Sequence, residues 1–290
     1  MTVRDFILGE GTLIRDGGMG TMLMDAGLKP GQCGEDFNVL YPERVRAIHD
    51  AYVAAGANFV LSNTFGDNPL RHKKGQTPLK DAVSAGVKLA KEAAANAKGV
   101  CFSLLDVGPL GALIEPLGDL EEDEAVELFI PGIEAGANAG ADAILIETIS
   151  DLTEMTAAVT AARRVCDLPI IATMTFDEHA RLFTGVDAGT AMRALSKLDV
   201  DMIGCNCGVG PAQVVSMMPV IMEAASKPVA VAPNAGLPVY KDGETRYPLS
   251  PEDFAANMAE IHRAGARLLG GCCGTTPAHI SAMAALCAGK

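Results

Sequence analysis

The chain has 290 residues, of which 49% are hydrophobic, so it is long enough to bury a sizeable core as one domain. Its 23 Lys and Arg against 36 Asp and Glu give a net charge of −13, which argues against nucleic acid or an anionic membrane surface as a partner. The sequence contains neither an apolar run long enough to span a membrane nor a basic N-terminal segment followed by a long apolar one, so we expect neither a membrane anchor nor export.

Short apolar runs alternate with Ala-rich stretches from Leu13 onward, which is the pattern of repeated βα units. The eight strands that this pattern predicts are 13–16, 59–63, 100–107, 143–147, 170–176, 202–207, 229–233 and 267–272. The eight helices that it predicts are 42–55, 79–97, 123–139, 152–166, 188–198, 212–225, 251–264 and 277–288. Gly56, Gly140 and Gly265 follow three of these helices in Ala-Gly-Ala phrases, where Gly can form the left-handed cap that precedes the next strand.

Eight strands with eight helices predict a closed (β/α)8 TIM barrel of the α/β class. An open doubly wound sheet fits less well, because neither a Rossmann glycine fingerprint nor a P-loop follows any predicted strand. No linker, charge block or low-complexity tract divides the chain, so residues 1–290 are expected to form a single barrel domain. In such a barrel the C-terminal ends of the strands meet at one mouth, where catalytic residues lie.

Three cysteines at predicted strand ends carry the strongest chemical signal. Cys272 and Cys273 are adjacent in a Gly-rich turn after the eighth strand, and Cys207 ends the sixth. Two adjacent sulfurs can serve one metal only where the strand has ended and the backbone turns, which the flanking Gly residues permit. Three thiolates with one open position suit a catalytic zinc, so Cys207, Cys272 and Cys273 are the predicted metal ligands and catalytic residues.

The remaining cysteines are interpreted as structural. Cys205 precedes Cys207 at strand spacing and is the rival ligand, but we expect it to pack inside the barrel one layer below the mouth. The other four, which have no evident partners in the sequence, are Cys33, Cys101, Cys166 and Cys287. Eight cysteines without a dense framework are typical of a reducing compartment, and we expect the protein to be cytoplasmic.

Other polar residues at the same mouth allow two interpretations. Asp16 and Glu147 end the first and fourth strands, where each carboxylate could cap a loop or a helix, or the two could bind the ammonium group of an amino acid. Gly17 begins a glycine cluster that could cradle a carboxylate. Asn63 and Thr64 could form a pocket wall or a capped loop.

Six segments, DGGMGT, SNTF, ETISDL, CNCG, PNAGLP and GGCCGTTP, occur in this order, each at a predicted strand end. They resemble the motifs of the homocysteine S-methyltransferase family over about residues 13–280, and most of all those of the homocysteine-binding domain of cobalamin-dependent methionine synthases. The resemblance implies a (β/α)8 barrel with zinc on the three cysteines and homocysteine sulfur as the fourth ligand. Gly18 and Ser62 stand where the family more often has Ala and Thr, which should not alter the chemistry.

The same resemblance implies roles in substrate binding. Asp16 and Glu147 match the positions that hold the substrate amino group, and the loops at Gly17 and Thr64 match those that flank its carboxylate. Asn234, in PNAGLP, would lie near the metal and occupy its open position when substrate is absent. The predicted substrate-binding residues are therefore Asp16, Gly17, Asn63, Thr64, Glu147 and Asn234.

The expected reaction is attack of the homocysteine thiolate on an electrophilic methyl group, giving methionine. The cobalamin signature D-x-H-x-x-G is absent, since segment 177–182 lacks the glycine, so we expect methylcobalamin to act only through a partner, a corrinoid protein or domain. Betaine and S-methylmethionine are alternative donors, although a chain with no Trp and four Tyr offers little for an aromatic cage around a cation.

Alternatives of another class are a zinc-binding thiol sensor without turnover and a zinc-free barrel lyase or aldolase acting on a phosphorylated substrate. The sequence leaves open whether the chain is free-standing or an excised domain, its oligomeric state, and whether another thiol replaces homocysteine.

Overall fold

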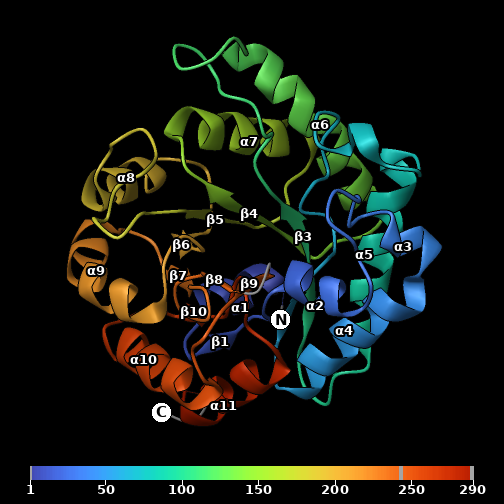
Figure 1. The fold of residues 1–290 in the computed structure, drawn as a ribbon. Coiled ribbons are helices and arrows are strands. Elements are labelled where there is room, and N and C mark those ends of the chain that lie inside the picture. Colours follow the sequence, from blue (N-terminus) through green and yellow to red (C-terminus); the bar gives the residue numbers. More distant parts are fainter. Residues whose placement is uncertain (1, 242–243, 288–290) are drawn as a thin grey trace.

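A computed structural model, which describes residues 2–241 and 244–287, contains the eight parallel strands of the predicted barrel (Figure 1). They are β1 (Leu13–Ile14), β2 (Phe59–Leu61), β3 (Phe102–Val107), β4 (Ala143–Ile149), β5 (Ile170–Met174), β6 (Met202–Asn206), β7 (Val229–Ala232) and β10 (Leu268–Leu269). Their order in the sheet is β1-β10-β7-β6-β5-β4-β3-β2. A parallel bridge between Arg15 and Phe59 joins the two edge strands, so the sheet closes on itself and the predicted TIM barrel is confirmed.

The eight predicted helices surround this sheet. They are α4 (Pro42–Ala54), α5 (Leu79–Ala95), α6 (Glu122–Asn138), α7 (Leu152–Val165), α8 (Ala188–Leu195), α9 (Pro211–Ala224), α10 (Pro251–Arg263) and α11 (Pro277–Cys287). Residue 288, the predicted end of the last helix, lies outside the described residues. None of the helices in the described ranges is long and apolar enough to cross a membrane.

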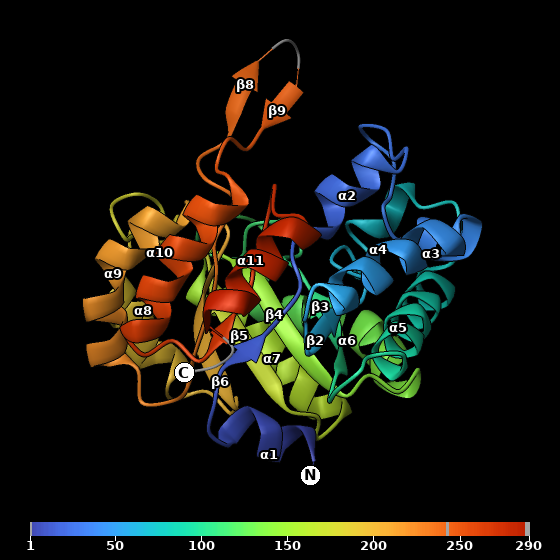
Figure 2. The ribbon, with the colours of Figure 1, turned by 90° about the horizontal axis from the view of Figure 1, so that it is seen from below.

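Several short elements were not predicted, because their apolar runs are too brief to show a period. They are α1 (Val3–Leu8), α2 (Met19–Asp25), α3 (Phe37–Leu40), the 3-10 helix η1 (His72–Lys74) and the hairpin β8 (Val239–Lys241) with β9 (Glu244–Arg246). Helix α1 covers the end of the barrel opposite the mouth, where Phe6 contacts the rings of Phe59 and Phe102. The hairpin projects from the other end, beyond the mouth (Figure 2).

Alternation along the strands separates two apolar layers. Residues such as Leu13, Leu104 and Leu145 fill the inside of the barrel, and their sequence neighbours pack between the sheet and the helices. Two residues further along each of these strands, the inward position is polar. Arg15, Asp106 and Glu147 occupy it, so the barrel interior changes from apolar to charged just below the mouth.

Helix α4 buries the imidazole ring of His49. Both ring nitrogens of His49 lack a hydrogen-bond partner among the described residues, and burial lowers its pKa from 6.5 to about 3. A group whose pKa is lowered on folding stabilises the fold above its unfolded pKa, and this contribution is lost as the pH falls. His49 should therefore make the protein sensitive to acid below pH ~6.5.

Between pH 8 and pH 5, we expect the free energy of unfolding to fall by about 2 kcal/mol more in the wild type than in His49→Leu. The reason is that His49 binds a proton in the unfolded chain in this pH range but stays neutral in the folded chain. Urea denaturation at several pH values measures the difference. Parallel pH profiles for the two proteins would contradict the assignment.

Candidate active site

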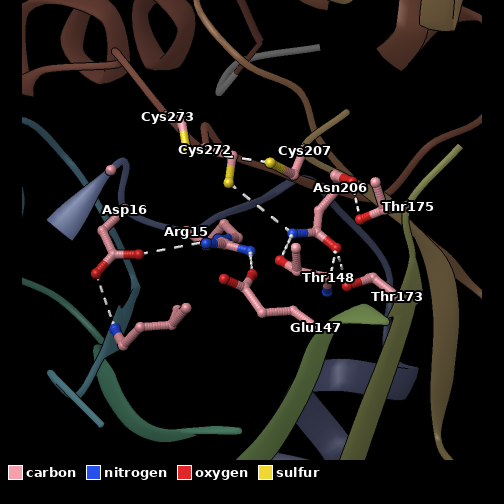
Figure 3. A network of polar contacts seen from close by, with 12 residues as sticks. Arg15, Asp16, Glu147, Thr148, Thr173, Thr175, Asn206, Cys207, Cys272 and Cys273 are labelled. Atoms are coloured by element: carbon pink, nitrogen blue, oxygen red, sulfur yellow. Dashed lines mark hydrogen bonds and ion pairs between the residues drawn. The ribbon is translucent and has the colours of Figure 1, made fainter. Parts of the chain in front are cut away.

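The sulfur atoms of Cys207, Cys272 and Cys273 converge at the mouth of the barrel (Figure 3). All three lie within 4.8 Å of one another, and Cys207 Sγ is 4.0 Å from Cys273 Sγ. Two thiolates on a tetrahedral zinc, with Zn–S bonds of about 2.3 Å, would be roughly 3.8 Å apart. The observed spacing therefore fits a metal with these three ligands.

The backbone at the strand ends brings the sulfurs together. Cys207 would face outward by strand alternation, but its φ of 57° places it in the left-handed region, and the chain turns at the mouth. On the opposite loop, Cys272 N donates to Pro233 O at 2.8 Å and Cys273 N donates to Asn234 Oδ1 at 3.1 Å. The backbone N–H groups of the adjacent cysteines are thus held by one backbone and one side-chain acceptor of the segment after β7.

The three cysteine thiols shift one another's pKa values. The pKa of Cys273 is lowered to about 3, because Cys207 and Cys272, and also the Tyr247 hydroxyl, donate hydrogen bonds to its thiolate. The pKa of Cys272 is raised well above its usual range by its hydrogen bonds with Cys207 and Cys273 and by burial. Without a bound cation, Cys273 is therefore the cysteine of the three that most readily becomes a thiolate, and the other two thiols donate hydrogen bonds to it.

Asn206 supports this cluster from the adjoining strands. Its Nδ2 donates to Thr148 Oγ1 at 2.7 Å and approaches Cys272 Sγ at 3.9 Å. Its Oδ1 accepts from Thr148 N at 2.9 Å and from Thr173 Oγ1 at 2.8 Å. One buried amide thus links β4, β5 and β6 to a cysteine, which fixes the orientation of the site.

A cavity of about 250 Å³ adjoins the cysteines. Its polar walls include Arg15, Asn63, Asp106, Glu147 and Thr148, and its apolar walls include Met19, Leu23, Leu28, Leu61 and Phe65. An enclosed space with a few convergent polar groups is typical of a site for a small molecule.

Buried charges gather on one side of the cavity. Arg15 Nη1 donates to Glu147 Oε2 at 2.7 Å, and Arg15 Nε is 3.8 Å from Asp16 Oδ1. Asp106 Oδ1 is buried without a hydrogen-bond partner among the described residues, and burial raises the Asp106 pKa well above its usual range. One guanidinium thus faces more carboxylates than it can neutralise, which suits a cationic ligand group.

Some of the predicted substrate-binding residues line the cavity, and others do not. Glu147, Asn63 and Gly17 line the cavity with the three cysteines. Asp16 Oδ2 instead accepts from Leu61 N at 2.8 Å, its Oδ1 is buried without a hydrogen-bond partner in the described part of the chain, and burial raises its pKa to about 7. Thr64 Oγ1 donates to Asp106 O at 2.8 Å, within the barrel wall.

The structure also places Asn234 and Cys205, and for Cys205 the expected position inside the barrel is wrong. Asn234 supports the backbone of Cys273 through its side-chain oxygen. Cys205 is buried with Ile203 between the sheet and the helices and not inside the barrel, because it has the parity of the outward-facing residues of β6. Cys205 therefore lies on the helix-facing side of the sheet, away from the cysteine cluster at the mouth.

Arg15, Asp106 and Asn206 are site residues that the sequence reading missed. Each is a polar residue within an otherwise apolar strand segment, two or four residues after an inward-facing apolar one. This alternation is the signal that could have identified them.

A family model for homocysteine S-methyltransferase matches residues 13–287. The chain belongs to the homocysteine S-methyltransferase family. Its curated relatives include methionine synthases of Mycobacterium tuberculosis, 35% identical over 296 aligned positions, and Mycobacterium leprae, 34% identical over 295. Each alignment covers 96% of this chain but 25% and 24% of the relative, so the chain spans about a quarter of their length.

Solved structures in the homocysteine S-methyltransferase family are similar over a nearly equal length. The metallated form of the homocysteine methyltransferase MmuM from Escherichia coli has a TM-score of 0.77 and 26% identity, with 96% of each chain covered. Its oxidized form has a TM-score of 0.76 and 26% identity, covering 97% and 99% of the two chains. The carboxyl transferase domain of Rhizobium etli pyruvate carboxylase, 12% identical with a TM-score of 0.53 over 93% of this chain and 41% of that one, shares the fold alone.

Glu147→Gln is expected to lower the free energy of unfolding by about 3 kcal/mol, because it leaves the buried Arg15 without its charged partner. In Arg15→Met/Glu147→Gln the loss should be smaller than the sum of the two single losses by at least ~1 kcal/mol. Urea denaturation of the four proteins measures this coupling.

The control is the exposed pair of Arg46 and Glu92, whose charged atoms are also 2.7 Å apart. Glu92→Gln should cost less than about 1 kcal/mol, because solvent screens the pair. Additive losses for Arg15 and Glu147 would show that their contact contributes little.

Proposed function

We propose that this chain, as a single barrel domain of residues 1–290, transfers a methyl group to the sulfur of homocysteine and so forms methionine. The observation that carries the proposal is the convergence of three cysteine sulfurs, all within 4.8 Å of one another, beside a cavity that Asp106 and Glu147 also line. Family membership supports the reaction type, and the cavity adjoining the sulfurs supports a small thiol amino acid as the acceptor.

The metal proposed for the cysteines is zinc. Three sulfur donors at this spacing suit zinc far better than magnesium or calcium, which prefer oxygen ligands. Cys207, Cys272 and Cys273 would hold it, and one position would stay open for the substrate sulfur. Bound zinc would keep the substrate sulfur as a thiolate at neutral pH, where a free thiol with a pKa of about 8.5 is mostly protonated.

The chain's own residues would orient the substrate. We assign its ammonium group to Glu147, as the resemblance implies, and add Asp106, which lines the cavity and whose Oδ1 has no hydrogen-bond partner among the described residues. Asp16, to which the resemblance gives the same role, is not among the cavity-lining residues and would act from beside Arg15. Arg15 holds Glu147 in place through Oε2, so the other carboxylate oxygen can face the substrate. The loops at Gly17 and Thr64 would flank the substrate carboxylate.

Two residues that adjoin this pocket have positioning roles in the proposal. Asn63 lines the cavity and donates through Nδ2 to Gly34 O at 2.8 Å, which fixes one wall. Asn234 holds the backbone of Cys273 through its side-chain oxygen, and as the resemblance implies it would occupy the open metal position in the absence of substrate. The apolar walls would exclude water from the thiolate.

The proposed methyl donor is a methylcorrinoid carried by another protein or domain. The mycobacterial relatives are named methionine synthases and extend far beyond the matched region. Among the described residues, Phe65 is the aromatic side chain that lines the cavity, and one ring is a poor cage for betaine or S-methylmethionine. These two donors are the alternative.

The purified protein is expected to contain about one zinc ion at the cysteine cluster, and Cys207→Ala, Cys272→Ala and Cys273→Ala should each lose most of it. Metal analysis after gel filtration, with circular dichroism to confirm folding, measures this. Cys205→Ala is the matched control and should retain the zinc, since Cys205 lies behind the sheet. Full retention by a folded Cys272→Ala protein would remove the basis of the proposed function.

Turnover should require an external donor. With homocysteine, free methylcobalamin is expected to be a slow donor and a methylated corrinoid protein a much faster one, and methionine formation measures both. Efficient transfer from betaine or S-methylmethionine would replace the donor and leave the acceptor chemistry intact. Zinc binding without any turnover would favour a thiol sensor, and a zinc-free active protein would favour a lyase or aldolase.

A further inference from the structure

A second cluster of metal-ligating side chains lies beside the cavity and shares Glu35 with its wall. Among the described residues, Cys33, Glu35 and His72 form the other group of three whose ligand atoms all lie within 4.8 Å of one another. Cys33 precedes α3 in the sequence, and His72 begins η1 in the loop after β2. Cys33 has no evident partner in the sequence, whereas the fold places it against a carboxylate and an imidazole.

The three groups leave one hydrogen-bond acceptor unfilled. His72 Nε2 lies 2.7 Å from Thr77 O, and a carbonyl only accepts, so Nε2 carries the proton and Nδ1 of the neutral ring presents a lone pair. Cys33 Sγ is 2.9 Å from Glu35 Oε2 and 3.5 Å from that Nδ1. A single S–H proton cannot serve both acceptors, whereas a cation among the three atoms can.

The spacing fits a metal ion of the zinc class. A sulfur and a nitrogen bound to tetrahedral zinc, with bonds of about 2.3 and 2.0 Å, would be roughly 3.5 Å apart. The Sγ–Nδ1 distance of 3.5 Å already has this value, and the Sγ–Oε2 distance of 2.9 Å would have to lengthen by roughly 0.6 Å. One sulfur, one nitrogen and one carboxylate oxygen suit zinc or cobalt better than magnesium or calcium.

The surroundings hold the ligands in position. Glu35 Oε1 accepts from Gly66 N at 2.6 Å, and a Cβ at Gly66 would lie 2.8 Å from that same oxygen. A Cβ at Gly75 would lie 2.5 Å from His72 Nε2. Both glycines therefore allow the ligand side chains to approach the backbone, and Thr77 O orients the imidazole as a carbonyl does in many metal sites.

We propose that Cys33, Glu35 and His72 form a second transition-metal site, which takes zinc or a chemically similar divalent ion. Bound metal would fasten the loop before α3 to the loop after β2. Because Gly34 and Glu35 from the first loop and Asn63 and Phe65 from the second line the same cavity, the site would stabilise the cavity wall from outside the reaction centre. The proposal does not depend on the methyl-transfer reaction.

Cobalt titration of a chain without the mouth cysteines tests the site directly. In Cys207→Ser/Cys272→Ser/Cys273→Ser, we expect one equivalent of Co²⁺ to give a sulfur-to-cobalt charge-transfer band in the near ultraviolet. Adding Cys33→Ser should abolish the band, and adding Glu35→Gln should weaken binding by about tenfold or more. Cys166→Ser is the matched control, because Cys166 is another half-buried thiol and caps α7 elsewhere in the barrel.

A folded triple variant that shows no band, or a band that survives Cys33→Ser, would overturn the proposal. If the triple variant does not fold, metal analysis of the zinc-saturated full chain decides instead. Two zinc ions in the wild type and one in Cys33→Ser would support the second site, and equal zinc content in both would refute it.

Discussion

The arrangement of three sulfur atoms at the barrel mouth is the constraint on which the rest of the site depends. Thiolates repel one another, and without a cation the cluster favours a single negative charge on Cys273. The barrel holds them together because they come from the ends of β6 and β10, on either side of β7. The left-handed backbone of Cys207 is a local cost that this arrangement imposes. The hydrogen bond from Cys273 N to Asn234 Oδ1 helps to hold the arrangement.

The buried charged groups beside the sulfurs are a second feature that costs stability, and a bound ligand would relieve this cost as well. Arg15 stabilises Glu147 but leaves Asp106 without a hydrogen-bond partner among the described residues. Such a group destabilises the empty fold and is relieved when a cationic group enters. In the proposed reaction the amino group of the substrate does this, while the sulfur end meets the cysteines. The two halves of the site would therefore fix both ends of one small molecule.

Part of the cavity wall comes from two loops that also contain metal-ligating side chains. The segment from α2 to α3 and the loop after β2 meet at Glu35, Cys33 and His72, which lie in a cluster held by backbone contacts. A metal there would act on the shape of the cavity through Gly34 and Asn63, whose contact joins the two loops at 2.8 Å. The strands hold the residues at their ends rigidly, whereas loops are more mobile. A metal that joins the loop before α3 to the loop after β2 would order this part of the cavity wall.

The sequence by itself determined the eight strands, the eight helices, the barrel and the family, because apolar periodicity and Gly-embedded cysteines are local features. It also identified Glu147 as a polar residue at a strand end. The tertiary structure alone decided that Arg15 pairs with Glu147, that Asp106 faces the cavity and that Cys205 faces the helices. It alone joined Cys33 to His72, which is 39 residues further along the chain. Alternation assigns the two faces of a strand only once one of its inward-facing residues is known, and contacts between loops depend on closure of the barrel, so the structure was needed to decide both.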